Sequence, residues 1–64
     1  MSRFKVLTRI EVAIKNSNKA ELDWADFYCT LRMQVAPNDD RQKYWQNVLQ
    51  DVHKARGRLL IHSE

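Results

Sequence analysis

The stretch PNDDRQKYWQNVLQDVHKARG, residues 37–57, decides the fold that the sequence predicts. Pro37 interrupts any preceding helix, and Asn38 and Asp39 are residue types that cap helix N-termini. Apolar residues then recur at the spacing of one helical face, at Trp45, Val48, Leu49, Val52 and Ala55. Gly57 is the residue type that most often ends a helix. These signals predict a helix over residues 39–56 in which the side chain of Trp45 is buried.

The length of the chain predicts one small domain, residues 1–64. A domain of this size buries only about 60% of the surface that its unfolded chain exposes, so its stability is marginal. The single cysteine excludes an internal disulfide, and no Cys/His spacing typical of a zinc site is present. We therefore expect well-packed helices, self-association or docking onto a larger partner to stabilise the fold.

The segment over residues 4–14 fits both a helix and a strand. Its alternate residues are mostly apolar or β-branched, as in a half-buried strand. A helical count instead places five apolar residues on one face: Val6, Leu7, Ile10, Ala13 and Ile14. Because eleven residues without a turn signal are long for a strand in so small a domain, we predict a helix over residues 3–15.

The middle of the chain predicts a loop over residues 16–19 and a second helix over residues 23–34, capped by Asp23 and ended before Pro37. Within this helix Trp24, Phe27, Tyr28 and Leu31 recur at helical spacing. Together with Tyr44 and Trp45 of the third helix, this gives five large rings close to one another. Most of them must form the core, and we expect Tyr28 and Tyr44 to reach the surface.

These elements predict an all-α fold, a compact three-helix domain with helices over residues 3–15, 23–34 and 39–56. A short apolar C-terminal tail follows, and its residues Leu59, Leu60 and Ile61 need a buried or partnered environment. The alternative is an α+β fold, in which the N-terminal segment and this tail form a small sheet.

The residues of catalytic and metal sites lack their usual partners in this sequence. Cys29 lies among aromatic and acidic residues, which raise rather than lower the pKa of a thiol, so we interpret it as a buried structural residue. His53 and His62 have no Cys, His, Asp or Glu three or four positions away, and the single glycine excludes a glycine-rich phosphate loop. We expect no enzyme activity, no metal and no cofactor.

The charge pattern places basic residues toward both ends of the chain and acidic residues in the middle, with a net charge of +3. Such mixed charge is usual for small soluble domains. No apolar run approaches the roughly 20 residues that a membrane span needs, and no signal-peptide core is present. Together with the free cysteine, this predicts a cytoplasmic protein that does not bind membranes.

Two functions fit these features. The first is a non-enzymatic small accessory or regulatory protein that binds a protein partner, or a second copy as a homodimer, through exposed aromatics and the apolar tail: Tyr28, Tyr44, Leu59, Leu60 and Ile61. The alternative is a nucleic-acid-binding regulator, similar to a helix-turn-helix protein, that uses the polar and basic face of the third helix: Lys43, Gln46, Asn47, Gln50, Lys54 and Arg58. Only the second predicts a steep loss of affinity with salt.

Overall fold

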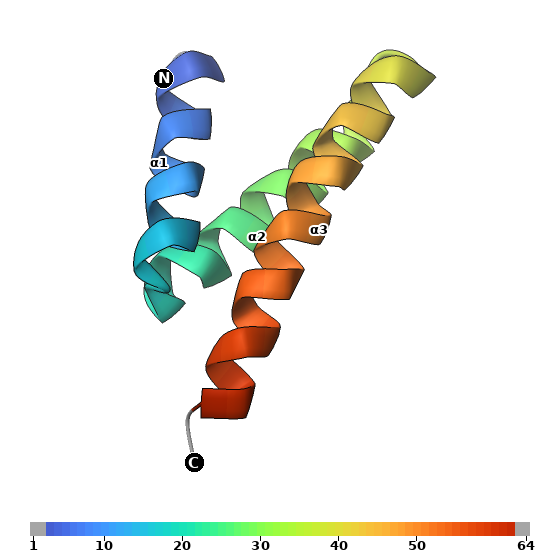
Figure 1. Ribbon diagram of the computed structural model, residues 1–64. Coiled ribbons are helices and arrows are strands. Elements are labelled where there is room, and N and C mark those ends of the chain that lie inside the picture. Colours follow the sequence, from blue (N-terminus) through green and yellow to red (C-terminus); the bar gives the residue numbers. More distant parts are fainter. Residues whose placement is uncertain (1–2, 63–64) are drawn as a thin grey trace.

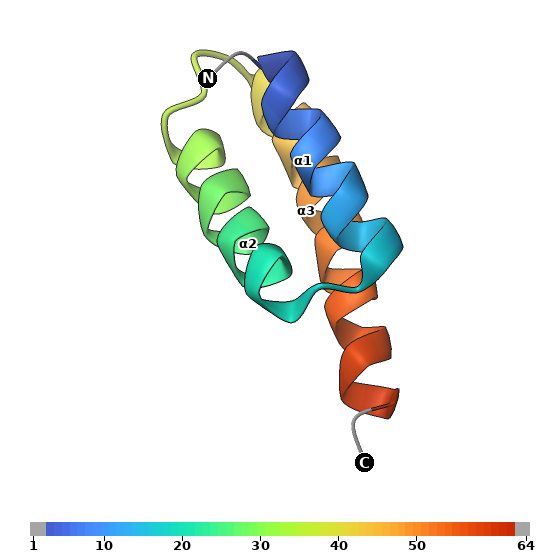
Figure 2. The same cartoon turned by 90° about the vertical axis from the view of Figure 1, so that its left-hand side faces the viewer.

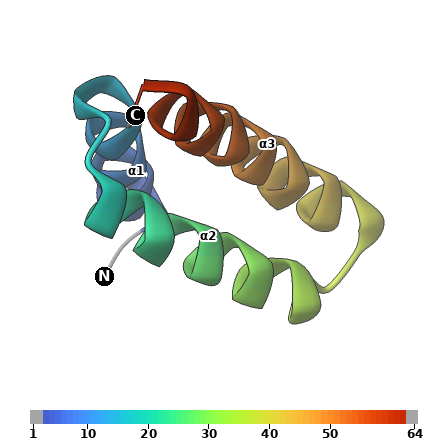
Figure 3. The same cartoon turned by 90° about the horizontal axis from the view of Figure 1, so that it is seen from below.

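The computed structural model describes the backbone of residues 3–62 and the side chains of residues 4–59. Three helices follow one another: α1 is Arg3–Asn16, α2 is Lys19–Gln34 and α3 is Asp39–His62. Helices α2 and α3 form an antiparallel hairpin, and α1 packs against both near the end where α2 begins (Figures 1 and 3). The predicted all-α, three-helix domain is confirmed. Because residues 3–62 contain no strand, the α+β alternative is wrong.

Helix α1 ends in a two-hydrogen-bond cap centred on Ser17. Ser17 has a positive φ of 51°, and its N–H donates to the carbonyl of Ile14 at 3.3 Å. The N–H of Asn18 reaches back to the carbonyl of Ala13 at 3.2 Å. This pair of bonds is the Schellman motif, which turns the chain sharply while satisfying the last carbonyl groups of the helix. The predicted loop therefore shortens to Ser17 and Asn18.

Helix α2 begins four residues earlier than the sequence predicts. Its N-cap is Asn18, whose side-chain oxygen accepts a hydrogen bond from the backbone N–H of Glu21 at 3.2 Å. Asp23, the predicted cap, lies inside the helix and pairs instead with cations from two elements. Both residue types are good caps, and local sequence did not choose between them because the choice depends on where Asp23 finds its partners.

The turn between α2 and α3 follows the sequence signals closely. The N–H of Val35 still donates to the carbonyl of Leu31, after which Ala36 and Pro37 leave the helix. Asn38 then caps α3, because its side-chain oxygen accepts a hydrogen bond from the N–H of Arg41 at 2.9 Å. The predicted start of the third helix is confirmed.

Helix α3 does not end at Gly57, and this corrects the predicted C-terminal boundary. Gly57 has no positive φ, and the helix continues through it to His62. Leu59, one turn after Ala55, packs against the core, so burial continues along the same face and offsets the cost of a helical glycine. The 24 residues of α3 span roughly 36 Å, nearly the full 40 Å length of the molecule. Figure 2 shows its C-terminal turns extending past α2.

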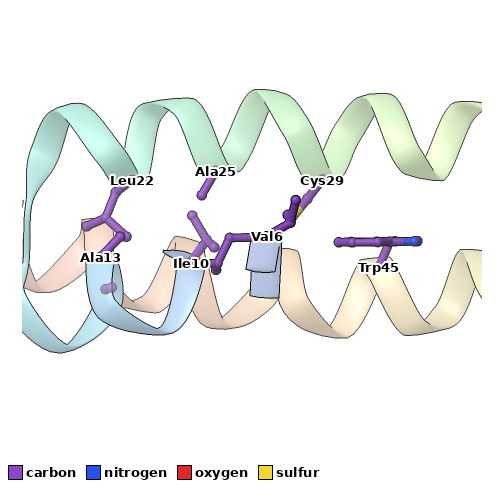
Figure 4. Close-up of a cluster of buried hydrophobic side chains, with 9 residues drawn as sticks. Val6, Ile10, Ala13, Leu22, Ala25, Cys29 and Trp45 are labelled. Carbon is purple, nitrogen blue, oxygen red and sulfur yellow. The ribbon is translucent and has the colours of Figure 1, made fainter. Parts of the chain in front are cut away.

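The core lies where the three helices meet. Figure 4 shows residues of α2 pointing toward those of α1, with Trp45 of α3 closing one end. The buried apolar residues are Val6, Ile10, Ala13, Leu22, Ala25, Cys29, Trp45, Val52 and Ala55. The predicted faces of the first and third helices and the burial of Trp45 are confirmed. The predicted face of α2 is wrong in part, because Leu22, Ala25 and Cys29 occupy the core while Phe27 and Leu31 face away from it.

Candidate functional site

The outward side of α2 carries a row of exposed apolar residues. Phe27 is 67% exposed, Leu31 43% and Val35 61%. Phe27 and Leu31 lie four residues apart on one helical face, and Val35, the C-cap residue directly after α2, continues the same spacing. We call these three residues the α2 outer face. Neither α1 nor α3 covers it, since both pack against other sides of α2 (Figure 3).

The orientation of α2 follows from what its other sides contact. Leu22, Ala25 and Cys29 turn into the core, where they are fully buried. Trp24 and Tyr28 lie half-buried on one flank, where their ring centroids are 5.3 Å apart. With the core on one side and these rings on the flank, the row that begins at Phe27 is left toward solvent.

An ionic cluster occupies the flank of α2 that faces α3. Asp26 accepts hydrogen bonds from Arg56 and, at 3.0 Å, from Nε2 of His53. Arg56 Nη2 also lies 3.1 Å from Asp23 Oδ1, and Lys19 Nζ lies 3.4 Å from Asp23 Oδ2. That Oδ1 atom makes no hydrogen bond, so its contact with Arg56 is an ion pair only. The cluster fixes α2 against α3 and compensates the acidic charge of α2.

The opposite flank of α2 is tied to α1 by Arg9. Its Nε and Nη2 donate to the two carboxylate oxygens of Glu21, at 3.0 and 2.7 Å. The same guanidinium lies over Trp24, with its carbon 3.8 Å from the ring centroid. The hydrogen bonds from Arg9 lower the pKa of the Glu21 carboxyl below its ordinary value. Both flanks therefore have partners within the fold, unlike the α2 outer face.

Cys29 has the surroundings of a core residue rather than a nucleophile. It is fully buried, and this burial, with the negative charge of Asp26, raises the pKa of its thiol to about 11. A thiol with so high a pKa is protonated at neutral pH and is a poor nucleophile. The sequence-based interpretation of Cys29 as a buried structural residue agrees with this geometry.

The described residues predicted to bind a protein partner lie on α2 and α3. Tyr28 is half-buried between Trp24 and Trp45, and Tyr44 is partly exposed with its ring edge against Trp45. Leu59 packs against the core. The side chains of Leu60 and Ile61 lie outside the described residues. Tyr28 and Tyr44 therefore contact the same ring of Trp45, while Leu59 lies against the core.

The residues predicted to contact nucleic acid share one exposed side of α3, as the helical count predicts: Lys43, Gln46, Asn47, Gln50, Lys54 and Arg58. The acidic Asp51 lies among them and is also exposed. Helices α2 and α3 run antiparallel beside each other, whereas helix-turn-helix proteins cross the two helices at about 90–120° (Figure 1). The polar side is present, but the helix-turn-helix geometry around it is not.

The described surface has several hollows, and one of about 440 Å³ is lined by Lys19, Asp23, Asp26, Phe27, Thr30 and Arg56. One of about 260 Å³ is lined by Lys19, His53, Arg56, Gly57 and Leu59. Another of about 240 Å³ lies at the hairpin turn, beside Trp45 and Val35. These last two are below the usual size of a substrate pocket, whereas the first is within it. Among the described residues no three Cys, His, Asp or Glu side chains gather as metal ligands, and no helix there combines the length and apolarity needed to cross a bilayer.

Comparison with known proteins found no protein-family model, curated protein or solved structure that matches this chain. The site must therefore be interpreted from its own residues. The sequence predicts Phe27 and Leu31 as apolar positions at helical spacing and places most of the aromatic rings in the core, without predicting an exposed apolar row. The signal that distinguishes them is the four-residue repeat from Phe27 to Val35, which is separate from the repeat through Leu22, Ala25 and Cys29.

Proposed function

We propose that this protein is a non-enzymatic accessory or regulatory protein of the cytoplasm that acts by binding another protein molecule through the α2 outer face. The observation that carries the proposal is the alignment of Phe27, Leu31 and Val35 on one side of a helix that no other element covers. Exposed apolar residues scattered singly are ordinary, as Phe4 and Val12 are on α1, but a contiguous row is a feature of interaction surfaces.

The chemistry of the surroundings supports binding rather than catalysis. The only thiol is buried and protonated at neutral pH. His53 is hydrogen-bonded to Asp26, and the acidic residues of α2 are paired with Arg9, Lys19 and Arg56. Asp23 and Asp26 line a hollow together with Phe27. An aromatic ring followed by two aliphatic side chains at four-residue spacing is instead the pattern by which one helix anchors to another.

The test compares two single substitutions that each add one negative charge to the surface. Leu31→Glu places a carboxylate at the centre of the α2 outer face, where a bound partner would desolvate it. Gln50→Glu places one on the exposed side of α3 and serves as the control. Tagged versions of both, and of the unsubstituted protein, are used to capture partners from cells that make the protein. We expect Leu31→Glu to reduce partner recovery at least tenfold and Gln50→Glu to leave it unchanged.

The same capture assay, extended to Lys43→Ala and Lys54→Ala, tests the nucleic-acid alternative. Circular dichroism is used to check that both variants remain folded. A loss of binding by a folded variant can then be assigned to the substituted surface. Equal recovery with Leu31→Glu and the unsubstituted protein contradicts the proposed surface. Loss of binding only in Lys43→Ala or Lys54→Ala, with affinity for duplex DNA that falls steeply as salt rises, would instead establish nucleic-acid binding through α3.

A further inference from the structure

We propose that the partner on the α2 outer face is a second copy of this chain, packed antiparallel about a two-fold axis beside Leu31. This inference rests on the proposed function, because it names the occupant of the same surface. It follows from three properties of that surface: the symmetry of its spacing, the absence of charge at its centre, and the small size of the core beneath it.

The spacing of the α2 outer face makes it complementary to itself. Phe27 and Val35 stand four residues before and after Leu31, which is about 6 Å along the helix in each direction. A two-fold axis beside Leu31 therefore brings Phe27 next to the partner's Val35, so that the largest side chain meets the smallest. Rows of residues spaced by four interdigitate when two helices cross at about −50°, the commonest class of helix packing. A two-fold contact uses the same patch on both copies, as this arrangement does.

The charge distribution favours a second copy at this face over the rest of the surface. Two copies of a chain with net charge +3 repel each other, so a shared surface must avoid opposing like charges. Within residues 27–35 the only charged residue is Arg32, whose guanidinium carbon lies 5.6 Å from the ring centroid of Trp45 in its own chain. Charged residues border both ends of the row. Lys19, Asp23, Asp26 and Arg56 line a hollow with Phe27, and Arg32 and Arg41 line one with Val35.

The small core gives the domain a reason to associate. Of the nine buried apolar residues within residues 4–59, three are alanines and one is Cys29, so this part of the chain buries few large side chains. Domains of this length often depend on oligomerisation to bury more apolar surface. Because only three apolar side chains on each copy form the row, we expect the contact to bury less than the roughly 1,200 Å² lower limit of standard interfaces. We therefore expect a weak dimer, with a dissociation constant in the micromolar range.

Sedimentation equilibrium of the full chain tests the association. The average mass should rise with concentration from 7.6 kDa toward twice that value. Leu31→Glu should remain at the monomer mass throughout, and Gln50→Glu should behave as the unsubstituted protein does. A chain that remains monomeric up to millimolar concentration, or a Leu31→Glu variant that still associates, overturns the inference.

Cysteine cross-linking tests the register of the pair. Under diamide, a thiol oxidant, Leu31→Cys should form a disulfide between copies. In the proposed pair the Cα atoms of residue 31 in the two copies face each other across the two-fold axis. A disulfide needs Cα atoms roughly 4.4–6.8 Å apart, whereas the two Phe27 positions stand about 12 Å apart along the helices. Phe27→Cys mixed with Val35→Cys should therefore give mainly the mixed disulfide. The unsubstituted protein is the control, since its Cys29 is buried.

The outcomes separate this inference from the function on which it rests. Cross-linking through Gln50→Cys but not through Leu31→Cys shows that copies associate elsewhere and overturns the proposed pair. If the chain remains monomeric while Leu31→Glu still abolishes capture of a different protein, the second-copy inference fails and the proposed function stands. If Leu31→Glu affects neither mass nor capture, both fail.

Discussion

Replacing Gly57 with alanine is expected to stabilise this protein, although glycine at this position resembles a helix stop in the sequence. Gly57 lies within α3, has no positive φ, and has no atom within 4 Å of the place where a Cβ would stand. The substitution therefore costs no steric energy and removes the penalty of glycine in a helix interior, about 0.5–1 kcal/mol relative to alanine. For a domain of this size each kcal/mol raises Tm by about 4–8 °C.

The assay is thermal unfolding followed by circular dichroism at 222 nm, at one fixed concentration because association also raises Tm. Ser17 provides the matched control, since it holds the positive φ of a true helix cap. There the favourable substitution is the reverse one, from a side chain to glycine. If Gly57→Ala instead lowers Tm, Gly57 holds the left-handed conformation of a cap, and α3 ends where the sequence signal placed its end.

Three further predictions concern the caps and the core. Ser17→Gly should stabilise the fold by up to about 1 kcal/mol, because glycine adopts the positive φ without the strain of a side chain; an unchanged or lower denaturation midpoint contradicts the cap. Asn18→Ala should cost about 1 kcal/mol through loss of its bond to the N–H of Glu21, whereas Asp23→Asn should leave the N-terminal boundary of α2 unchanged in NMR chemical shifts. Cys29 should resist alkylation in the native state. Because the pKa of its thiol is raised from 9.0 to about 11 in the fold, its contribution to stability should be complete below pH 9.0 and should be lost as the pH rises toward about 11. Urea unfolding across this range checks the last prediction, because a Cys29→Ala variant should lack this part of the pH dependence.

The sequence by itself determined the fold class and most of the helix positions. The apolar repeat that ends in Val52 and Ala55 can be recognised in the sequence of α3 alone. Apolar residues at a helical period lie on one side of the helix, and that side is the buried one. Asn38 after Pro37 is equally local, since a cap bonds to the N–H three residues later in the same chain. The start of α3 and the identity of its core face therefore needed no knowledge of neighbouring helices.

Only the tertiary structure decided which side of α2 faces solvent and where two helix boundaries fall. Two apolar rows run along α2, and α1 and α3 bury the row through Ala25 and Cys29 while leaving Phe27 and Leu31 exposed. Asp23 lies inside the helix because Arg56, 33 residues later, lies beside it, and α3 continues past Gly57 with Leu59 packed on the core. These outcomes depend on contacts between residues far apart in the chain, whose energies no local pattern contains.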